Sequence, residues 1–438
     1  MVPSPGATSL SPPLAQPRSV AVSALVLLSS LFFIWGFVTV LNDILIPHLK
    51  AVFELSYGQV LLIQFVFYTA YFVTSLPWSR FIERVGYRRA LVVGLVVMAA
   101  GALGFLPSAS FTSFPLFLTS LFVLASGIAL LQVAANPYVA VMGPAESAPA
   151  RLNLVQAFNS FGTVVAPIFG GLLILSTSVS GVDAAQSVLT AEQRIADAQS
   201  VKLPYLFIVA VLITLAIAVS RFRLPDIDVT AHRRAKASGV GGSIWRHRNL
   251  VFGVPAIFIY LIAEIGIGST LVNYISLPEI GAMSHADASY CLTLFWLGAM
   301  LGRFGGSFLM RWISAERLLA AVSIGAFVLT TTSIFSSGHL AMWTLILVGL
   351  CHSIMFPTIF TLGIRGLGPL TEKGAGLLIM AIAGGALSAL QGVIADYAGL
   401  QWSYLLPAAC YVYVLFYAVW GSRVPAEVAE PDEALAQN

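Results

Sequence analysis

The stretch VAVSALVLLSSLFFIWGFVTVLND, from Val20 to Asp43, determines the class of this protein. Its apolar part, up to Leu41, is long enough to cross the hydrocarbon core of a bilayer as a single helix. Asp43 follows near the end of this run, and a carboxylate at membrane depth costs roughly 2.5–3.5 kcal/mol on insertion scales. We therefore predict that Asp43 uses its charge or its proton in function. The alternative is a solvated cap at the watery end of the helix.

The whole chain has the composition of an integral membrane protein. Hydrophobic residues make up 58% of its 438 residues and charged residues only 9%, whereas soluble domains carry about 25% charged residues. No basic stripe outside the loops indicates a nucleic-acid partner. Cys291, Cys351 and Cys410 fall inside apolar runs, which favours buried free thiols over disulfides or metal ligands. We expect no cofactor and no metal, and the lipid bilayer is the first expected partner.

Hydropathy predicts twelve membrane-spanning helices and therefore an all-α fold. The longest polar insert lies near the midpoint with six spans on either side, which predicts two six-helix bundles, residues 21–222 and 249–422, joined by a linker, 223–248. Residues 1–20 are expected to form a disordered tail and residues 423–438 a second tail. The expected spans are 21–42, 58–78, 88–106, 114–138, 152–175, 204–220, 250–272, 288–310, 318–335, 339–362, 374–394 and 403–420.

The lysines and arginines predict the orientation. If the N-terminus lies inside and the spans alternate, eighteen of the 22 lysines and arginines fall on the inner side. Three, Lys50, Arg194 and Lys202, fall on the outer side, and Arg303 lies within a span. By the positive-inside rule, both termini are expected in the cytoplasm of a cell whose inner membrane holds the protein.

The loop Ser79-Arg-Phe-Ile-Glu-Arg-Val-Gly-Tyr-Arg-Arg89, between the second and third spans, resembles a signature of the major facilitator superfamily. That signature reads Gly-x-x-x-Asp/Glu-Arg-x-Gly-Arg-Arg/Lys. Gly86 would allow a tight reversal, and Glu83 would pair with arginines to latch the two bundles. Arg303, in the eighth span, would either join this inner gate or pair with a buried acid. The matching positions are Glu83, Arg84, Gly86 and Arg88, and the departures are Ser79 and Tyr87.

Other stretches resemble one family within that superfamily, the fucose permeases and glucose/galactose transporters. The resemblance implies a symporter that imports a monosaccharide with a proton or a sodium ion. An aspartate in the first helix and a glutamate in the fourth are the key acids of the fucose permease. Asp43 matches the first, but Gln132 stands at the second, so the chain looks closer to the glucose/galactose branch. The stretches are Leu41-Asn-Asp-Ile-Leu-Ile-Pro47, Gln132-Val-Ala-Ala-Asn-Pro-Tyr138, Arg151-Leu-Asn-Leu-Val-Gln-Ala-Phe-Asn-Ser-Phe-Gly162, Gly302-Arg-Phe304 and Pro357-Thr-Ile-Phe-Thr-Leu-Gly363.

Four amide side chains are candidates for sugar binding. Gln132 cannot take up a proton, but an amide both donates and accepts hydrogen bonds, as a sugar hydroxyl does. Asn136 follows four residues later, and Gln156 and Asn159 are three residues apart, so each pair shares a helix face. We predict a shared polar cavity, which the resemblance supports for Gln156 and Asn159. The alternative is that the amides hold neighbouring helices together.

Glu264, near the middle of the seventh span, is the second intramembrane acid. It is expected to pair with a cation, to be protonated, or to face a watery cavity and bind sugar hydroxyls. We therefore predict Glu264 as a rival of Asp43 for ion coupling and as a sugar ligand. Asn273, nine residues further on and on another face of the helix, is a further candidate for sugar binding.

Together these features predict a secondary transporter, not an enzyme. It would import a hexose with a cation, with a proton favoured over sodium, by alternating access and as a monomer. One alternative is uptake of the amino sugar N-acetylglucosamine. Another is a proton-coupled drug or organic-ion antiporter of the same fold, whose cavity should be more aromatic and less amide-rich. A membrane-embedded enzyme or receptor is disfavoured, because no Ser/His/Asp set, metal cluster or phosphate loop appears in the sequence.

Overall fold

A computed structural model describes residues 18–52, 57–111, 113–170, 202–222 and 243–424 of the chain. All regular secondary structure in these ranges is helical, as predicted. Most of the two expected tails and of the expected linker 223–248 lies outside the described residues.

The described residues of the N-terminal half form six long helices. Each forms where the sequence offers an apolar run, because a chain in hydrocarbon must satisfy its backbone hydrogen bonds within itself. The helices are α1 (Arg18–Val52), α2 (Tyr57–Val85), α3 (Tyr87–Ser110), α4 (Phe114–Val141), α5 (Ala148–Gly170) and α7 (Lys202–Arg221), with the short 3₁₀ helix η1 (Ala145–Ser147) before α5.

Residues 243–424 of the C-terminal half form six more helical stretches, three of which are interrupted. The continuous helices are α9 (Arg248–Ile275), which follows the 3₁₀ turn η4 (Ile244–Arg246), α10 (His285–Leu309) and α11 (Ala315–Phe335). The interrupted stretches are α12 (Gly338–His352) with α13 (Met355–Ile364); η5 (Gly368–Leu370) and α14 (Thr371–Met380) with η6 (Ala381–Ser388) and α15 (Ala389–Ala398); and α16 (Leu400–Ser403) with α17 (Leu405–Phe416) and η7 (Tyr417–Gly421). The prediction of twelve helical spans is therefore confirmed.

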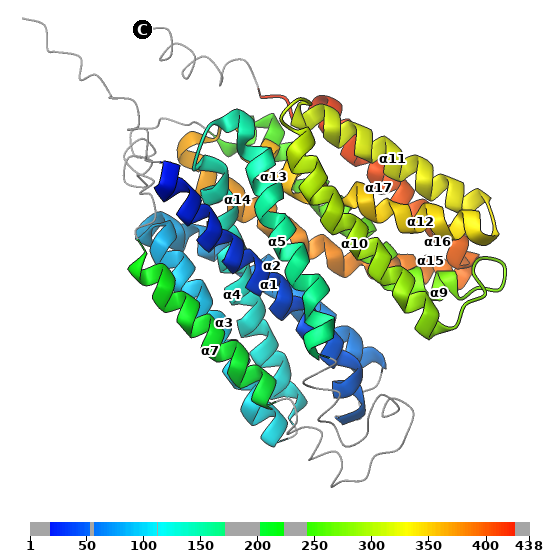
Figure 1. Ribbon diagram of the computed structural model, residues 1–438, viewed down its shortest axis with the longest axis horizontal. Coiled ribbons are helices and arrows are strands. Elements are labelled where there is room, and N and C mark those ends of the chain that lie inside the picture. The colour runs from blue at the N-terminus through cyan, green and yellow to red at the C-terminus, as the bar shows by residue number, and fades with distance from the viewer. Residues whose placement is uncertain (1–17, 53–56, 112, 171–201, 223–242, 425–438) are drawn as a thin grey trace, which may run out of the picture.

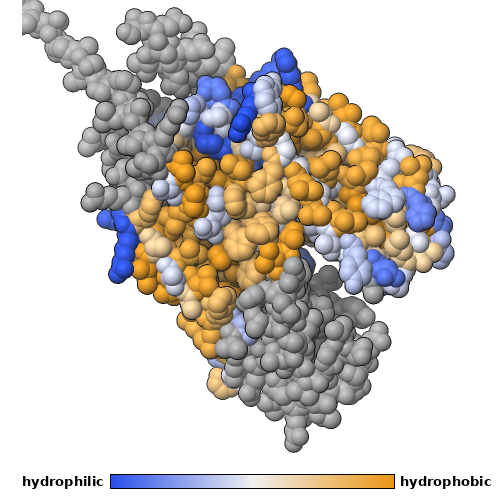
Figure 2. All heavy atoms as spheres, in the orientation of Figure 1, coloured by the Kyte–Doolittle hydropathy of each residue, from blue (hydrophilic) through white to orange (hydrophobic). Residues whose placement is uncertain are grey.

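The outer surface of the helices suits a lipid environment. Ten helical stretches in the described residues are long and apolar enough to cross a membrane. Large apolar side chains such as Phe65, Phe72, Leu301 and Val412 are exposed. In Figure 2, hydrophobic residues cover the middle of the visible face, and hydrophilic residues gather at its margins. Cys291, Cys351 and Cys410 are free thiols.

The helices form two bundles that meet along a central interface. In the first bundle α3 packs between α4 and α7, and α1 packs on α5; in the second, α11 packs on α12 and α17. The bundles meet where α5 lies beside α10, as Figure 1 shows, and where α2 packs against α14 and η6. The polar residues predicted to act in transport lie on several of these interface helices.

One end of the molecule carries most of the basic loops, and we call it the basic end. Here α2, α4, α10, α13 and η7 finish and α3, α5, α9, α11 and α14 begin. The reversal between α2 and α3 occurs at Gly86, whose φ of 83° lies in the left-handed region that favours glycine. Each bundle therefore has short connections between its helices at this end.

Candidate functional site

Three of the four predicted amides meet between α2, α4 and α5. Gln132 is 4% exposed, and its Nε2 donates a hydrogen bond to the hydroxyl of Tyr71 on α2 at 2.8 Å. Gln156 on α5 donates from Nε2 to Oδ1 of Asn136 on α4 at 3.3 Å. The side chains of Asn136 and Gln156 are buried as well. The hydrogen bond between Asn136 and Gln156 thus connects the amide pair on α4 with the amide pair on α5.

Two polar atoms of this amide cluster have no partner among the described residues. They are Oε1 of Gln132, an acceptor, and Nδ2 of Asn136, a donor. The two residues are one helical turn apart on α4, so the open acceptor and the open donor lie on the same face. An unpaired buried polar group costs about 1–3 kcal/mol, so a ligand that supplies both partners would gain this energy.

Asn159 makes a different contact. Its Nδ2 donates to the backbone oxygen of Phe32 on α1 at 2.9 Å, and its side chain is only partly buried. The described hydrogen bonds therefore connect Asn159 to the packing of α5 on α1, and none of them joins it to the other three amides.

Glu264 is buried inside the second bundle, with 8% of its surface exposed. It lies near Tyr260, one turn earlier on α9, and near enough to Arg303 on α10 for the two charges to interact. The Tyr260 hydroxyl donates to the backbone oxygen of His352 at 3.0 Å. The His352 ring contacts the hydroxyl of Tyr411 through Nε2 at 2.6 Å. Glu264 thus belongs to a buried polar group of the second bundle.

Arg303 contacts both bundles. Its Nε donates to the backbone oxygen of Ser353 at 2.9 Å, within the second bundle. Its Nη1 donates to the backbone oxygen of Gln156 at 3.4 Å and to the hydroxyl of Ser160, both on α5 of the first bundle. One guanidinium therefore binds the helix that carries Gln156 and also acts electrostatically on Glu264. Sequence reasoning missed Ser160, although it lies four residues after Gln156 and on the same helix face.

The described contacts of this arrangement include neither Asp43 nor Asn273. Asp43 lies within α1, but its side chain is outside the described part of the chain. Asn273 is exposed near the end of α9, about 14 Å along the helix axis from Glu264, given a rise of 1.5 Å per residue. Asn273 and Glu264 therefore do not share a contact surface.

The loop that resembles the superfamily signature makes contacts of two kinds. Arg88 donates to the backbone oxygens of Val219 and Ser220 at the end of α7, within its own bundle. Tyr87, which stands where the signature has an arginine, contacts Glu372 of the other bundle at 3.0 Å. Glu83 is partly buried and Arg84 is exposed. Sequence reasoning treated Tyr87 only as a departure from the pattern, and no signal in the sequence indicated its distant partner.

Further hydrogen bonds close the basic end between the bundles. Nδ2 of Asn153 on α5 donates to the hydroxyl of Thr358 on α13 at 3.3 Å. The hydroxyl of Ser307 on α10 donates to the backbone oxygen of Ala150 on α5 at 2.8 Å. With the contacts of Arg303 and Tyr87, these bonds hold the two bundles together at this end.

Comparisons with known proteins agree with this architecture. Residues 26–390 match the profile of the family described as the Major Facilitator Superfamily. A glucose/galactose transporter of Brucella abortus biovar 1 (strain 9-941) is 47% identical over 401 residues, which cover 91% of this chain and 94% of that protein. An L-fucose-proton symporter of Escherichia coli (strain K12) is 35% identical over 406 residues, covering 91% and 92%. Identity is higher with the glucose/galactose relative, as the sequence resemblance predicted.

A solved structure gives the same result for the fold. The crystal structure of a major facilitator superfamily transporter, FucP, in the outward conformation superimposes on this chain with a TM-score of 0.81. The two sequences are 32% identical, and the match covers 92% of this chain and all of that one.

Proposed function

Because the chain belongs to the Major Facilitator Superfamily, a superfamily of transporters, we propose that it imports a hexose together with a cation by alternating access. The activities of the relatives, glucose/galactose transport and fucose–proton symport, support a monosaccharide as substrate. A proton is favoured over sodium as the coupling ion, because one of these relatives is described as a proton symporter. A bacterial inner membrane is the proposed location, and the monomer is the proposed functional unit.

The observation that carries the sugar assignment is the pair of open amide atoms on α4. Gln132 offers an acceptor and Asn136 offers a donor, one turn apart and both buried. A hexose carries several hydroxyls, each of which both donates and accepts hydrogen bonds, so one sugar can supply a donor to Gln132 and an acceptor to Asn136. Both atoms are shielded in the present conformation, so the sugar reaches them as the bundles move. Gln156, bonded to Asn136, and Asn159 would complete the sugar site from α5.

We propose that Asp43 and Glu264 carry the ion coupling, one in each bundle. Arg303 would connect ion binding to the conformation of the transporter. It donates to Gln156 and Ser160 across the interface, and its charge interacts with that of Glu264. When a proton or a sodium ion neutralises Glu264, the attraction between Glu264 and Arg303 weakens. The energy of the closed interface then changes, which would couple ion binding to the movement of the bundles.

The basic end would face the cytoplasm, with both chain termini on that side. Under this orientation the bonds at the basic end close the cytoplasmic side of the transporter. The similarity to a structure in the outward conformation supports the same state for this one. Coupled transport requires that a charged carrier holding only one of its two cargoes rarely changes conformation. The contacts of Arg303 across the interface would supply that barrier.

Counterflow in proteoliposomes tests the proposed function. Vesicles loaded with unlabelled sugar are given labelled glucose, with galactose, mannose, fructose, fucose or N-acetylglucosamine as competitor. We expect exchange of a hexose and no exchange of a cationic dye. Dye transport without sugar exchange would instead establish an organic-ion antiporter, and strongest competition by N-acetylglucosamine would establish amino-sugar uptake.

A further inference from the structure

A basic pocket lies at the basic end of the second bundle, apart from the amide cluster and from the interface between the bundles. It has a volume of about 640 Å³ and lies where α11 begins and where α13 and η7 end. This volume is within the range of roughly 300–1,000 Å³ that is usual for small-molecule sites. The proposed transport mechanism does not use it.

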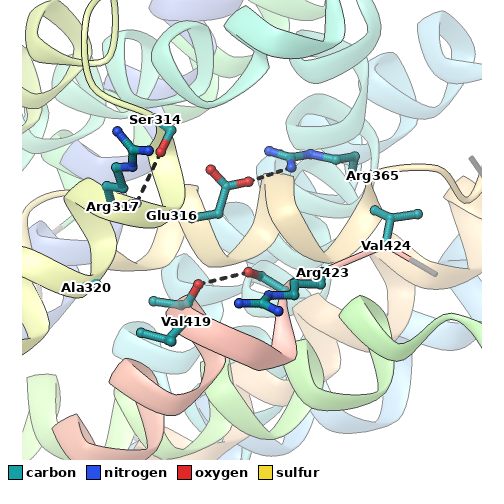
Figure 3. A pocket seen from close by; sticks show the side chains of 10 residues that line it. Ser314, Glu316, Arg317, Ala320, Arg365, Val419, Arg423 and Val424 are labelled. Atoms are coloured by element: carbon teal, nitrogen blue, oxygen red, sulfur yellow. Dashed lines mark hydrogen bonds and ion pairs between the residues drawn. The ribbon is translucent and has the colours of Figure 1, made fainter. Parts of the chain in front are cut away.

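Three arginines from three different elements line this basic pocket. Arg317 comes from the first turn of α11, Arg365 follows α13, and Arg423 follows η7. Figure 3 shows them around Glu316, which pairs with Arg365 at 2.5 Å. Glu316 is the single acid among the described lining residues, so its pairing leaves the charges of Arg317 and Arg423 uncompensated within the lining. The start of α11 adds the positive end of a helix dipole.

Apolar side chains also line the pocket. They are those of Ala320, Ala418, Val419 and Val424, and Val419 is 54% exposed. The pocket thus combines cationic groups with apolar side chains. A phospholipid has the same division between an anionic phosphate and an acyl chain, whereas a free sugar phosphate or inorganic phosphate has no apolar part.

Exposed tryptophans place this pocket at the level of the lipid headgroups. Trp312 lies in the turn before α11 and is 68% exposed, and Trp420 lies on η7 and is 42% exposed. Tryptophans gather at the boundary between hydrocarbon and water, where their rings sit among headgroups. The guanidinium of Arg248 lies over the ring of Trp420. Arginine also matches a phosphate with two parallel N–H donors, which makes it a common ligand for this group.

We propose that this pocket binds the phosphate headgroup of an anionic phospholipid, with Arg317 and Arg423 as its ligands. Arg365 stays in its ion pair with Glu316 beside them. The lipid joins the start of α11 to the ends of α13 and η7. Basic pockets between membrane helices are known to take such headgroups.

Lipid retention by the purified full-length protein tests this site. Native mass spectrometry compares phosphatidylglycerol with phosphatidylcholine of the same acyl chains. We expect preferential retention of phosphatidylglycerol, and a loss of roughly tenfold or more in Arg317→Gln/Arg423→Gln, because each arginine near an anionic headgroup adds attraction. The matched control is Arg80→Gln/Arg89→Gln, which removes two exposed arginines from the basic end of the first bundle and should retain phosphatidylglycerol. Equal retention by wild type and the pocket variant would overturn the proposal.

Two further measurements distinguish a bound lipid from other anions in the pocket. Inorganic phosphate at millimolar concentration should not displace phosphatidylglycerol, and displacement would assign the pocket to a soluble anion. The sequence beyond Val424 contains four acids, Glu427, Glu430, Asp432 and Glu433. Truncation after Val424 should leave lipid retention unchanged. If the full chain retained no phosphatidylglycerol and the truncated chain did, the acidic segment and not a lipid would be the occupant.

Discussion

The hydroxyl of Tyr87 on α3 lies 3.0 Å from Oε1 of Glu372 on α14, and this hydrogen bond joins the two bundles at the basic end. Glu372 is only 1% exposed, and Tyr87 is 4% exposed. A buried carboxylate needs a donor, and hydrogen bonds to charged groups contribute about 1.5–3 kcal/mol. Because the contact joins the two bundles, it stabilises this conformation over one in which the bundles have separated there.

Tyr87→Phe should therefore shift the protein toward conformations with an open basic end. The loss of about 1.5–3 kcal/mol corresponds to a change of roughly tenfold to a hundredfold in the equilibrium between closed and open states. Double electron–electron resonance between spin labels at positions 89 and 317, in a variant whose native cysteines are replaced by serine, would measure the fraction of molecules with an open basic end.

A double-mutant cycle and a control make this test specific. Glu372→Gln should shift the same equilibrium, and the double variant should shift it no further than the larger single change. Tyr417→Phe removes a buried hydroxyl that contacts the backbone oxygen of Asn249 at 3.1 Å within one bundle, so it should leave the distances unchanged. Additive effects of Tyr87 and Glu372 would show that the two residues do not act as a pair.

Gly385 is expected to be required for the packing of η6 on α2. A Cβ at this position would lie 2.6 Å from the ring of Tyr68 in the other bundle. Gly385→Ala should therefore destabilise the protein by about 1–3 kcal/mol, the usual cost of overpacking, as measured by thermal unfolding in detergent. The second change Tyr68→Ala should recover part of this loss. Gly392→Ala is the matched control, because nothing lies within 4 Å of its added Cβ and its stability should not fall.

Gln156→Ala should weaken sugar binding by about 1–3 kcal/mol, because it leaves Oδ1 of Asn136 without its partner in the proposed sugar site. Asn159→Ala should weaken binding by a similar amount and should also lower stability, since Asn159 bonds the backbone of α1. Equilibrium binding of labelled sugar to purified protein measures both affinities. Asn249→Ala is the control, because Asn249 makes three hydrogen bonds to backbone oxygens within the second bundle, away from the amides. This variant should affect stability and not affinity. Wild-type affinity in the first two variants would mean that these amides only hold helices together.

Asp43→Asn should abolish uphill accumulation of sugar, while counterflow exchange, which needs no net ion movement, continues. The substitution keeps the shape of the side chain and removes its charge and its proton. With sodium as the coupling ion, the same variant should lose stimulation by sodium. Glu264→Gln must be measured beside it under the same ion gradient. Normal accumulation by Asp43→Asn and none by Glu264→Gln would assign the coupling to Glu264 alone.

Tags at Asn438 and within the linker 223–248 should both report the cytoplasm, and a tag at Asp197 should report the outside. The reason is the excess of lysines and arginines on the loops expected inside. Fusions to reporters that are active on only one side of the membrane give the answer. Opposite locations for the linker and the C-terminus would disprove the twelve-span topology, and a cytoplasmic Asp197 would disprove the orientation.

The sequence alone determined the membrane class, the number of helices and most of their bounds. An apolar run of about 20 residues has one stable form in hydrocarbon, because only a helix satisfies its backbone groups locally. The expected span 114–138 became α4, Phe114–Val141, and the expected span 250–272 became α9, Arg248–Ile275. The resemblance to a sugar transporter family also came from local stretches such as Gln132 to Tyr138, which need no partner to be recognised.

Only the tertiary structure decided which polar side chains meet. Gln132 contacts Tyr71, Arg303 contacts Ser160, and Tyr87 contacts Glu372. Membrane helices are apolar on most faces, so the sequence carries little periodic signal for the direction in which a polar residue points. That direction follows from how each helix is rotated and crossed against helices far away in the chain. For the same reason the basic pocket, which combines α11, α13 and η7, follows only from the packing of the bundle.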